Sequence, residues 1–350
     1  MELMTATPFY AMNTSNITGR NNSLYEDNDD KDEQAELEQS LKIMILIFLS
    51  LAFVFGVFMN GMVIWVTGFK MKKTINTVWF LNLAVADLLF TSFLPLSVTY
   101  IALDFHWPFG NFMCRLRSLL IFLNMFASVY FLVVISVDRC VSVVWPVWAQ
   151  NHRSVRKASC VSLVVWILAL ILSAPYFIYR GTVSDPYNED IVHCFSNFAL
   201  SDDNETPSLN ELRQFRIQTM MITRFLLGFV VPFTVLISCY SVIIHRLRRN
   251  RTLASQSSRT FKIIAAIITT FFLFSAPFHI MALIEMVNYT AIHSSKTLDH
   301  VTTIGFPIAA CLAYLNSCLN PLLYVFIGKD LKEQICKSIL NLLETAFQEE

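Results

Sequence analysis

Several charged side chains lie inside long apolar runs of this chain. A charge in such a run is expected to have an ion-pair partner or a functional role. Asp87 lies in the middle of one run, Arg224 lies eight residues before Pro232 in another, and Asp138-Arg139 ends a third. Charged residues in such runs are rare and mark ion or ligand sites by default. The runs hold no pair of acids and no His/Asp set at catalytic spacing. The expected chemistry is therefore binding, and we predict that the chain is not an enzyme.

The elements that carry these side chains are seven apolar runs of membrane-spanning length. Apolar residues make up 55% of the chain and charged residues only 15%, and about 20 consecutive apolar residues suffice for one crossing. The runs are Ile43–Val66, Thr77–Leu103, Cys114–Val144, Ala158–Ile178, Thr219–Ile244, Ile263–Val287 and Thr302–Phe326. We predict an all-α membrane protein, a seven-transmembrane helix bundle with a short amphipathic helix after the seventh span. Its parts are an N-terminal tail (1–40), the transmembrane domain (41–327) and a cytoplasmic helix and tail (328–350).

Loop charge predicts the orientation of the bundle. The segments 67–76, 140–157 and 245–262 are rich in Lys and Arg and hold no Asp or Glu. Cytoplasmic loops carry such a basic excess, so we expect a multi-pass plasma-membrane protein with an extracellular N-terminus. No cleavable signal peptide is visible. The predicted glycosylation sites are the sequons that then lie outside, at Asn13, Asn16, Asn21, Asn204 and Asn288.

The first 40 residues form an acidic tail, with nine acids against Arg20 and Lys31. They lack the apolar content to fold alone, so we expect disorder in the free protein. The tail is either a solvated, glycosylated extension or an anionic arm that steers a basic partner toward the bundle.

Cysteine positions predict one covalent link and one lipid anchor. Of the eight cysteines, only Cys114 and Cys194 lie at the outer side, where an oxidising environment favours their pairing. Cys336 follows the seventh span in an amphipathic run. That run suits a helix lying along the inner leaflet of the bilayer, with Cys336 as a palmitoylation site.

A polar cluster is expected around Asp87. Amides from Asn60, Asn316 and Asn320 are candidates to satisfy its carboxylate, and such oxygen ligands could also hold a small cation. The predicted sodium site comprises Asp87, Ser128, Asn316, Ser317 and Asn320. The alternative is a carboxyl group satisfied by amides for packing alone. We predict no other cofactor.

Two arginines allow two interpretations each. Arg139 either snorkels to the cytoplasmic boundary or is held in an ion pair with the adjacent Asp138, which a cytoplasmic partner would break. Arg224 either forms an internal pair with Glu285 or anchors a ligand carboxylate, for which a guanidinium is well shaped.

Taken together, these features resemble the rhodopsin-like G-protein-coupled receptors from about Ile43 to the end of the chain. The residues that carry the resemblance are Asn60, Leu83-Ala84-Val85-Ala86-Asp87, Cys114, Asp138-Arg139-Cys140, Trp166, Pro232, Tyr240, Pro277 and Asn320-Pro321-Leu-Leu-Tyr324. Finer stretches, such as His106-Trp-Pro-Phe-Gly110 and Asn316-Ser-Cys-Leu-Asn-Pro321, are similar to the chemoattractant subgroup, closest to its chemerin-receptor and formyl-peptide-receptor group.

The resemblance implies an outer ligand pocket and an inner coupling surface. The pocket would be lined by Asn124, Arg224, His279 and Glu285. Activation would involve Asp138, Arg139, Tyr240, Phe271, Ser275, Pro277, Asn320, Pro321 and Tyr324. The implied partners are an extracellular peptide or lipid chemoattractant, a heterotrimeric G protein of the inhibitory class, arrestin and the lipid bilayer, but no nucleic acid. The favoured ligand is a chemerin-like peptide with a C-terminal carboxylate.

Span six departs from the pattern of the family, because Ser275 stands where these receptors usually have Trp. A non-signalling scavenger is therefore one alternative, and a lipid-mediator receptor of the prostanoid type is another. A transporter would show internal repeats and interrupted helices in two halves, and the sequence shows neither.

Overall fold

The computed structural model describes residues 26–198, 207–249, 251–290, 296–327 and 333. Within these residues, seven helical stretches are long and apolar enough to cross a membrane. Their helices are α2 (Glu26–Trp65), α3 (Ile75–Ser92) with α4 (Leu94–Ala102), α5 (Gly110–Val144), α7 (Val155–Ile178), α8 (Pro207–Phe225) with α9 (Val231–Arg249), α10 (Arg251–Thr290) and α11 (Lys296–Ile327). The predicted seven-helix bundle is confirmed.

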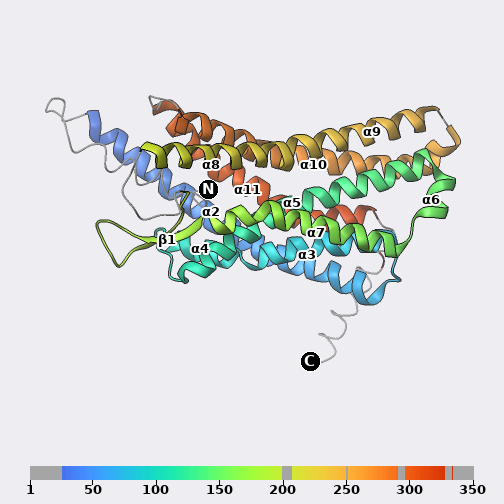
Figure 1. Cartoon of the computed structure of the whole chain (residues 1–350), viewed down its shortest axis with the longest axis horizontal. Helices are drawn as coiled ribbons and strands as arrows, with labels where there is room; N and C mark the ends of the chain where they lie inside the picture. Colours follow the sequence, from blue (N-terminus) through green and yellow to red (C-terminus); the bar gives the residue numbers. More distant parts are fainter. Residues whose placement is uncertain (1–25, 199–206, 250, 291–295, 328–332, 334–350) are drawn as a thin grey trace.

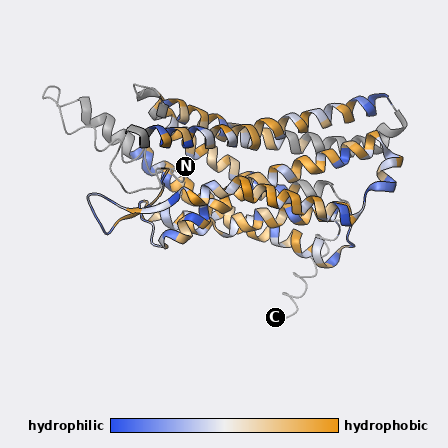
Figure 2. Ribbon diagram, viewed as in Figure 1, coloured by the Kyte–Doolittle hydropathy of each residue, from blue (hydrophilic) through white to orange (hydrophobic). Residues whose placement is uncertain are grey.

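The helices lie side by side along one long axis (Figure 1). A hairpin of β1 (Arg180–Ser184) and β2 (Val192–Ser196) lies at one end, and the short helix α6 (Pro146–His152) lies at the other. We call the end with the hairpin the outer end and the end with α6 the inner end. Apolar colouring dominates the middle of the bundle, whereas polar residues gather toward its two ends (Figure 2).

The core of the bundle is built around α5. In its most apolar stretch 67% of residues are buried, against 22% for the spans of α2 and α7. Large side chains on α2 and α7 point outward, among them Ile47, Phe55, Leu163 and Ile171, which are each more than half exposed. An apolar surface of this extent is unfavourable in water and suits contact with lipid.

Helix α2 corrects one prediction. It begins at Glu26, so residues 26–40 continue the first span as helix and the expected disorder is wrong for them. Extending an existing helix avoids the unfavourable nucleation step, and acids near a helix N-terminus are favoured by its dipole. The rest of the tail, residues 1–25, lies outside the described residues.

The fifth span is interrupted where it meets the centre of the bundle. A π-helical turn, η2 (Leu226–Val230), joins α8 to α9 just before Pro232. Proline has no backbone N–H and disturbs the helical hydrogen bonds of the preceding turn. The hydroxyl of Tyr130 on α5 donates to the carbonyl of Leu227 at 3.0 Å, which satisfies a backbone acceptor at this interruption.

Several predicted modification sites lie outside the described residues. They are Asn13, Asn16, Asn21, Asn204 and Cys336, and the amphipathic helix predicted after residue 327 lies outside as well, apart from residue 333. Asn288 is described and lies near the end of α10. Glycosylation and palmitoylation stay predictions.

Candidate functional site

A cavity near the outer end of the bundle contains two of the four residues predicted to bind a ligand. We call it the outer cavity. Arg224 and Glu285 both line it, and its volume is about 520 Å³. Its other lining residues are Ser118, Phe122, Tyr176, Tyr179, Arg180, Ser196, Phe198, Ile217, Met220 and Met221. The lining thus combines aromatic and sulfur-containing side chains with two cations and one acid.

Arg224 is held in the wall of this cavity by aromatic rings. Its guanidinium carbon lies 5.4 Å from the ring centroid of Phe278 and 6.0 Å from that of Phe122. Phe122 in turn stacks on Tyr176. A cation over an aromatic face gains about 0.5–2 kcal/mol, more when it is desolvated. Because Arg224 is only 4% exposed, these rings fix its position beside the cavity.

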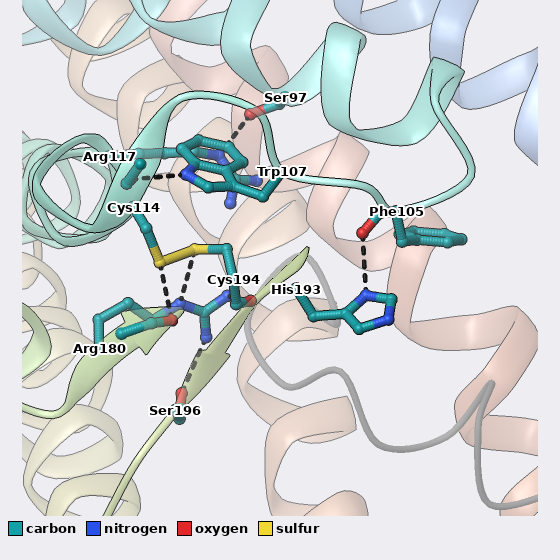
Figure 3. The surroundings of a disulfide bond; sticks show 11 residues. Ser97, Phe105, Trp107, Cys114, Arg117, Arg180, His193, Cys194 and Ser196 are labelled. Carbon is teal, nitrogen blue, oxygen red and sulfur yellow. Dashed lines mark hydrogen bonds between the residues drawn. A yellow bond between two sulfur atoms is a disulfide. The ribbon is translucent and has the colours of Figure 1, made fainter. Parts of the chain in front are cut away.

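The hairpin is fastened over the outer end by a disulfide. Cys114 of α5 and Cys194 of β2 are bonded, with a Cα–Cα distance of 5.7 Å, as the sequence predicted. Figure 3 shows Arg180 of β1 beside this bridge. Arg180 donates to Ser196 Oγ at 2.8 Å and to the carbonyl of Cys194 at 2.9 Å. The hairpin therefore presents a held arginine to the outer cavity.

A histidine provides a second attachment of the hairpin. His193 is 2.9 Å from the carbonyl of Phe105 and 3.2 Å from Asp185 Oδ2. The backbone of Trp107 also donates to the carbonyl of Val192 at 2.7 Å. The contacts with Phe105 and Trp107 join β2 to the loop between α4 and α5 (Figure 3).

Arg117 is a buried residue that the sequence analysis missed. It is 1% exposed, donates to Ser97 at 2.8 Å, and lies over the rings of Tyr100 and Trp107. Its place in an otherwise apolar run, three residues after Cys114, was the available signal. Arg117 links α5 to α4 near the disulfide (Figure 3).

The other two predicted ligand-binding residues, Asn124 and His279, line a different cavity deeper in the bundle, which we call the inner cavity. Its volume is about 660 Å³. Its aromatic lining includes Phe90, Phe271, Phe278 and Tyr314, and its polar lining includes Asn124, Ser128, Asn316 and Ser317. Phe122 belongs to the lining of both cavities. The four residues expected in one pocket are therefore divided between two neighbouring cavities.

Asp87 lies fully buried at the centre of a polar core. Its Oδ1 accepts from Asn124 Nδ2 at 2.9 Å and from Ser128 Oγ at 3.1 Å. Its Oδ2 accepts from Asn320 Nδ2 at 2.8 Å. Ser317 joins indirectly, because its hydroxyl donates to Asn124 Oδ1 at 3.0 Å. The structure thus groups the predicted residues Asp87, Ser128, Ser317 and Asn320, and places Asn316 in the wall of the inner cavity.

Two details of this core differ from expectation. Asn60 donates to the carbonyls of Gly56 and Ser317 rather than to Asp87. Asn124, expected in the ligand pocket, supplies an amide to Asp87 instead. The helical phase of Asn124 explains this: it lies one turn before Ser128, on the same face of α5.

The polar core contains acceptors suited to a small cation. The side-chain oxygens of Asn60 and Asn320 are buried and receive no hydrogen bond from any residue that the structure describes. The Asn320 oxygen belongs to the amide group that donates to Asp87, and this oxygen and the Asp87 carboxylate are hard oxygen ligands, which sodium-like ions prefer. Within the described ranges, no three His, Cys, Asp or Glu side chains gather as a site for a metal ion.

At the inner end of α5, the ion pair between Asp138 and Arg139, one of the two interpretations of Arg139, is not formed. Asp138 accepts two hydrogen bonds from Arg153, at 2.8 Å and 2.6 Å. Arg139 donates to Asn76 Oδ1 at 2.8 Å. Adjacent residues on a helix point in different directions, so each side chain finds a partner on another segment.

The remaining residues predicted to take part in activation are distributed along three helices. Tyr240 of α9 packs with a small cluster at the inner end that includes Ile243 and Leu247. Phe271 of α10 is buried and stacks with Phe229. Ser275 lines the inner cavity, Pro277 lies inside α10, and Pro321 lies inside α11. Tyr324 is also in α11, and its side chain is outside the described part.

Seven membrane-length helices around a buried carboxylate, closed by a disulfide-linked hairpin, define a seven-helix membrane receptor. The chain matches the 7 transmembrane receptor (rhodopsin family) over residues 59–324. The chain belongs to this family of receptors, which are not enzymes.

Curated relatives place it within the chemoattractant-type receptors. It is 44% identical over 310 residues to chemerin-like receptor 1 of Rattus norvegicus, covering 87% of this chain and 81% of that protein. It is 41% identical over 313 residues to the C3a anaphylatoxin chemotactic receptor of Oncorhynchus mykiss, covering 89% and 81%. It is 38% identical over 314 residues to formyl peptide receptor 2 of Mus musculus, covering 90% and 88%.

Proposed function

We propose that this protein is a plasma-membrane receptor for a chemerin-like peptide whose C-terminal carboxylate reaches Arg224 in the outer cavity. The observation that carries the proposal is the position of Arg224. It is nearly fully buried, is flanked by the rings of Phe122 and Phe278, and forms part of the cavity wall. A guanidinium recognises a carboxylate through charge-assisted hydrogen bonds.

The lining of the outer cavity suits a peptide that ends in a carboxylate. Its aromatic and methionine side chains suit apolar peptide residues, while Arg180 and Arg224 give the lining a positive balance over Glu285. The relatives point the same way, since the names of all three receptors refer to a protein or peptide. A lipid acid of the prostanoid type shares the carboxylate, so the test below includes one.

Signalling would follow from a shift between two arrangements of the bundle. We infer that agonist binding rearranges the helices around Pro232, Pro277 and Pro321 and makes Arg139 accessible to a G protein of the inhibitory class. Arg139 is held by Asn76, and Asp138 by Arg153. Both sets of contacts join α5 to neighbouring segments at the inner end and could break on activation. The tail after Phe326 offers few phosphate acceptors, Ser338 and Thr345, which argues against arrestin capture through a long phosphorylated tail.

The sodium ion is part of the same proposal. Asp87, Ser128, Asn316, Ser317 and Asn320 would hold it, and the buried Asn320 oxygen that receives no hydrogen bond from a described residue fits that role. The ion would favour the inactive bundle.

The test uses Arg224→Ala with Arg213→Ala as the matched control. Arg213 lies on the same helix and carries the same charge, but it is not among the residues lining the outer cavity. At equal surface expression, we expect a peptide with the C-terminal sequence of chemerin to lose about 30-fold or more in potency on Arg224→Ala, because losing one partner of a buried charge pair costs about 2–5 kcal/mol. The readout is nucleotide exchange on purified inhibitory-class G protein.

Amidating the peptide separates a ligand contact from a structural role. On the wild type the amide should lose a similar factor, and on Arg224→Ala it should lose little more, because both changes remove the same contact. Independent, additive losses would assign Arg224 to the structure of the bundle. Full activation by a prostanoid acid and none by the peptide would identify the lipid-mediator alternative.

Ser275 is the specific observation that favours a second candidate, a scavenger. Phe271 is retained one turn away, so an aromatic group is still available for the conformational change. If labelled peptide is internalised without nucleotide exchange on any G-protein class, the scavenger function is correct. Surface staining of an N-terminal tag on intact cells tests the plasma-membrane location and the orientation.

A further inference from the structure

Two thiols lie next to each other between α5 and α9 near the inner end of the bundle, and the proposed peptide function uses neither. Cys140 belongs to α5 and Cys239 belongs to α9. Both cysteines are free and partly exposed, and their side chains are close enough to share a hydrogen bond. The pair therefore connects two helices that are far apart in the sequence.

The packing of the two helices holds this pair in place. Cys140 packs against Ile243 and Leu247 of α9. Cys239 precedes Ile243 by one helical turn, so both residues lie on the same face of α9. That face is turned toward α5. The contact between the thiols therefore follows from the interface of two long helices rather than from the rotamer of one side chain.

The other free cysteines of the described residues are placed differently. Cys160 is exposed on α7, whereas Cys311 and Cys318 are buried in α11 and lie two helical turns apart. A disulfide requires two sulfur atoms at about 2.05 Å, and a pair that is already in contact reaches this distance by small side-chain movements. Cys140 and Cys239 are thus the free cysteines that this part of the chain brings together.

We propose that Cys140 and Cys239 form a reversible oxidation site, whose oxidant is a small neutral hydroperoxide and whose product is a disulfide between α5 and α9. The sulfur of one deprotonated cysteine attacks a peroxide oxygen, the O–O bond breaks, and a sulfenic acid forms while water or an alcohol leaves. The second sulfur then attacks the sulfenic sulfur, the S–O bond breaks, and the oxygen leaves as water with the released proton. Two thiols and one hydroperoxide thus give one disulfide, one alcohol and one water. The two sulfurs lose the two electrons that the peroxide gains.

The location of the pair makes the reduced form the resting state. The basic loops predict that the inner end of the bundle faces the cytoplasm, where thiol reductants keep cysteines reduced. A rise in hydroperoxide forms the bond, and exchange with a thiol reductant breaks it again. A neutral oxidant suits the site, because a charged molecule would lose its hydration on reaching thiols that are partly covered by apolar side chains.

The position of the pair gives the bond a consequence for signalling, and this part of the inference rests on the proposed function. Cys140 directly follows Arg139, and Cys239 directly precedes Tyr240, and both neighbours are expected to take part in activation. The proposed activation moves α9 around Pro232, seven residues before Cys239. A covalent bond across the interface of α5 and α9 opposes that movement. The oxidised receptor should therefore bind the peptide without activating a G protein.

The first test asks whether the bond forms. Purified full-length receptor in nanodiscs is treated with hydrogen peroxide, catalase removes the excess, the remaining thiols are alkylated, and the peptides are mapped without reduction. We expect a linked peptide that contains Cys140 and Cys239, and a thiol reductant should remove it at a dose that leaves Cys114–Cys194 intact. Cys160→Ser is the matched control, because it removes a thiol from another span and should leave the linked peptide unchanged. If both thiols are still alkylated at a peroxide dose that fully oxidises added glutathione, the proposal is wrong.

The second test measures nucleotide exchange and unfolding temperature on the same samples. Oxidation should lower agonist-driven exchange of the wild type at least about fivefold and raise its unfolding temperature by about 2 °C or more, because a cross-link restricts the unfolded chain. Cys239→Ser keeps every methionine and should respond to oxidation in neither measurement, and Cys140→Ala is a second variant in case the first does not fold. A linked peptide with unchanged exchange and unfolding temperature would overturn the proposed restraint. If the reduced wild type does not respond to the peptide, the proposed function is wrong, while the peptide map and the unfolding temperature still decide whether the pair is an oxidation site.

Discussion

Asp87 and Arg224 are both charges buried in the bundle, but their surroundings differ. The Asp87 carboxylate accepts hydrogen bonds from Asn124, Ser128 and Asn320. Arg224 lies against two aromatic rings in the wall of a cavity that Glu285 also lines. The first arrangement ties three helices together, and the second leaves room for a ligand beside the charge. Burial alone therefore does not distinguish a charge that joins helices from one that borders a cavity, whereas the surrounding groups do.

The largest effect on stability is expected from Asp87→Leu. This change removes the acceptor of three buried donors, and each unsatisfied donor costs about 1–3 kcal/mol. We expect a loss of at least about 3 kcal/mol, measured as a lower unfolding temperature in detergent. Asp87→Asn retains a carbonyl oxygen as acceptor and should lose clearly less. Equal losses for the two variants would show that the hydrogen bonds of the polar core do not stabilise the bundle.

The next effect concerns sodium. If the ion binds beside Asp87 and favours the inactive bundle, replacing an inert organic cation by sodium at equal ionic strength should weaken agonist binding about tenfold, within the 1–3 kcal/mol usual for coupled sites. Competition binding measures this, and Asp87→Asn should remove the dependence while Arg224→Ala should not. If sodium does not change the agonist affinity of the wild type, the proposed sodium site is wrong. The polar core is then a purely structural cluster.

The smallest effect is expected at the inner end, where Arg153 is partly exposed. Its two hydrogen bonds to Asp138 join α5 to the segment after α6. Such a charge-assisted pair near the surface contributes about 1 kcal/mol or less. In a double-mutant cycle with Arg153→Gln and Asp138→Asn, we expect a coupling of that size in thermal stability, together with raised basal nucleotide exchange. Strictly additive variants would show that the pair does not stabilise the inactive form.

The sequence predicted the spans and the disulfide because both depend on strong local signals. Uninterrupted apolar length identifies a membrane helix, and Cys114 and Cys194 were the only cysteines on the oxidising side. It also identified Asp87 as the centre of a polar core. Each of these inferences depends only on how deep a residue lies in the membrane, and not on the direction in which its side chain points.

What the sequence did not predict depends on the rotation of helices about their axes. Asn124 turns toward Asp87 and does not line the outer cavity with Arg224, and Asp138 turns toward Arg153 rather than Arg139. Depth does not fix these directions, because they follow from the packing of neighbouring helices. The helical state of residues 26–40 was missed for another reason: composition predicted no independent folding, whereas these residues extend a helix already stabilised by the membrane.

Helix α2 has a consequence for the distance at which the receptor meets its ligand. Its 40 residues at about 1.5 Å each give a length of about 60 Å, twice the hydrocarbon thickness of about 30 Å. Lys42 contacts Asp104 in the loop between α4 and α5, so the helix leaves the bundle close to this loop. The segment before Lys42, rich in Asp and Glu, therefore extends as helix for roughly 20 Å beyond this contact. Electrostatic attraction decays over about 8 Å in physiological salt. The acidic helical segment therefore carries negative charge farther from the membrane than charges on the surface of the bundle can act.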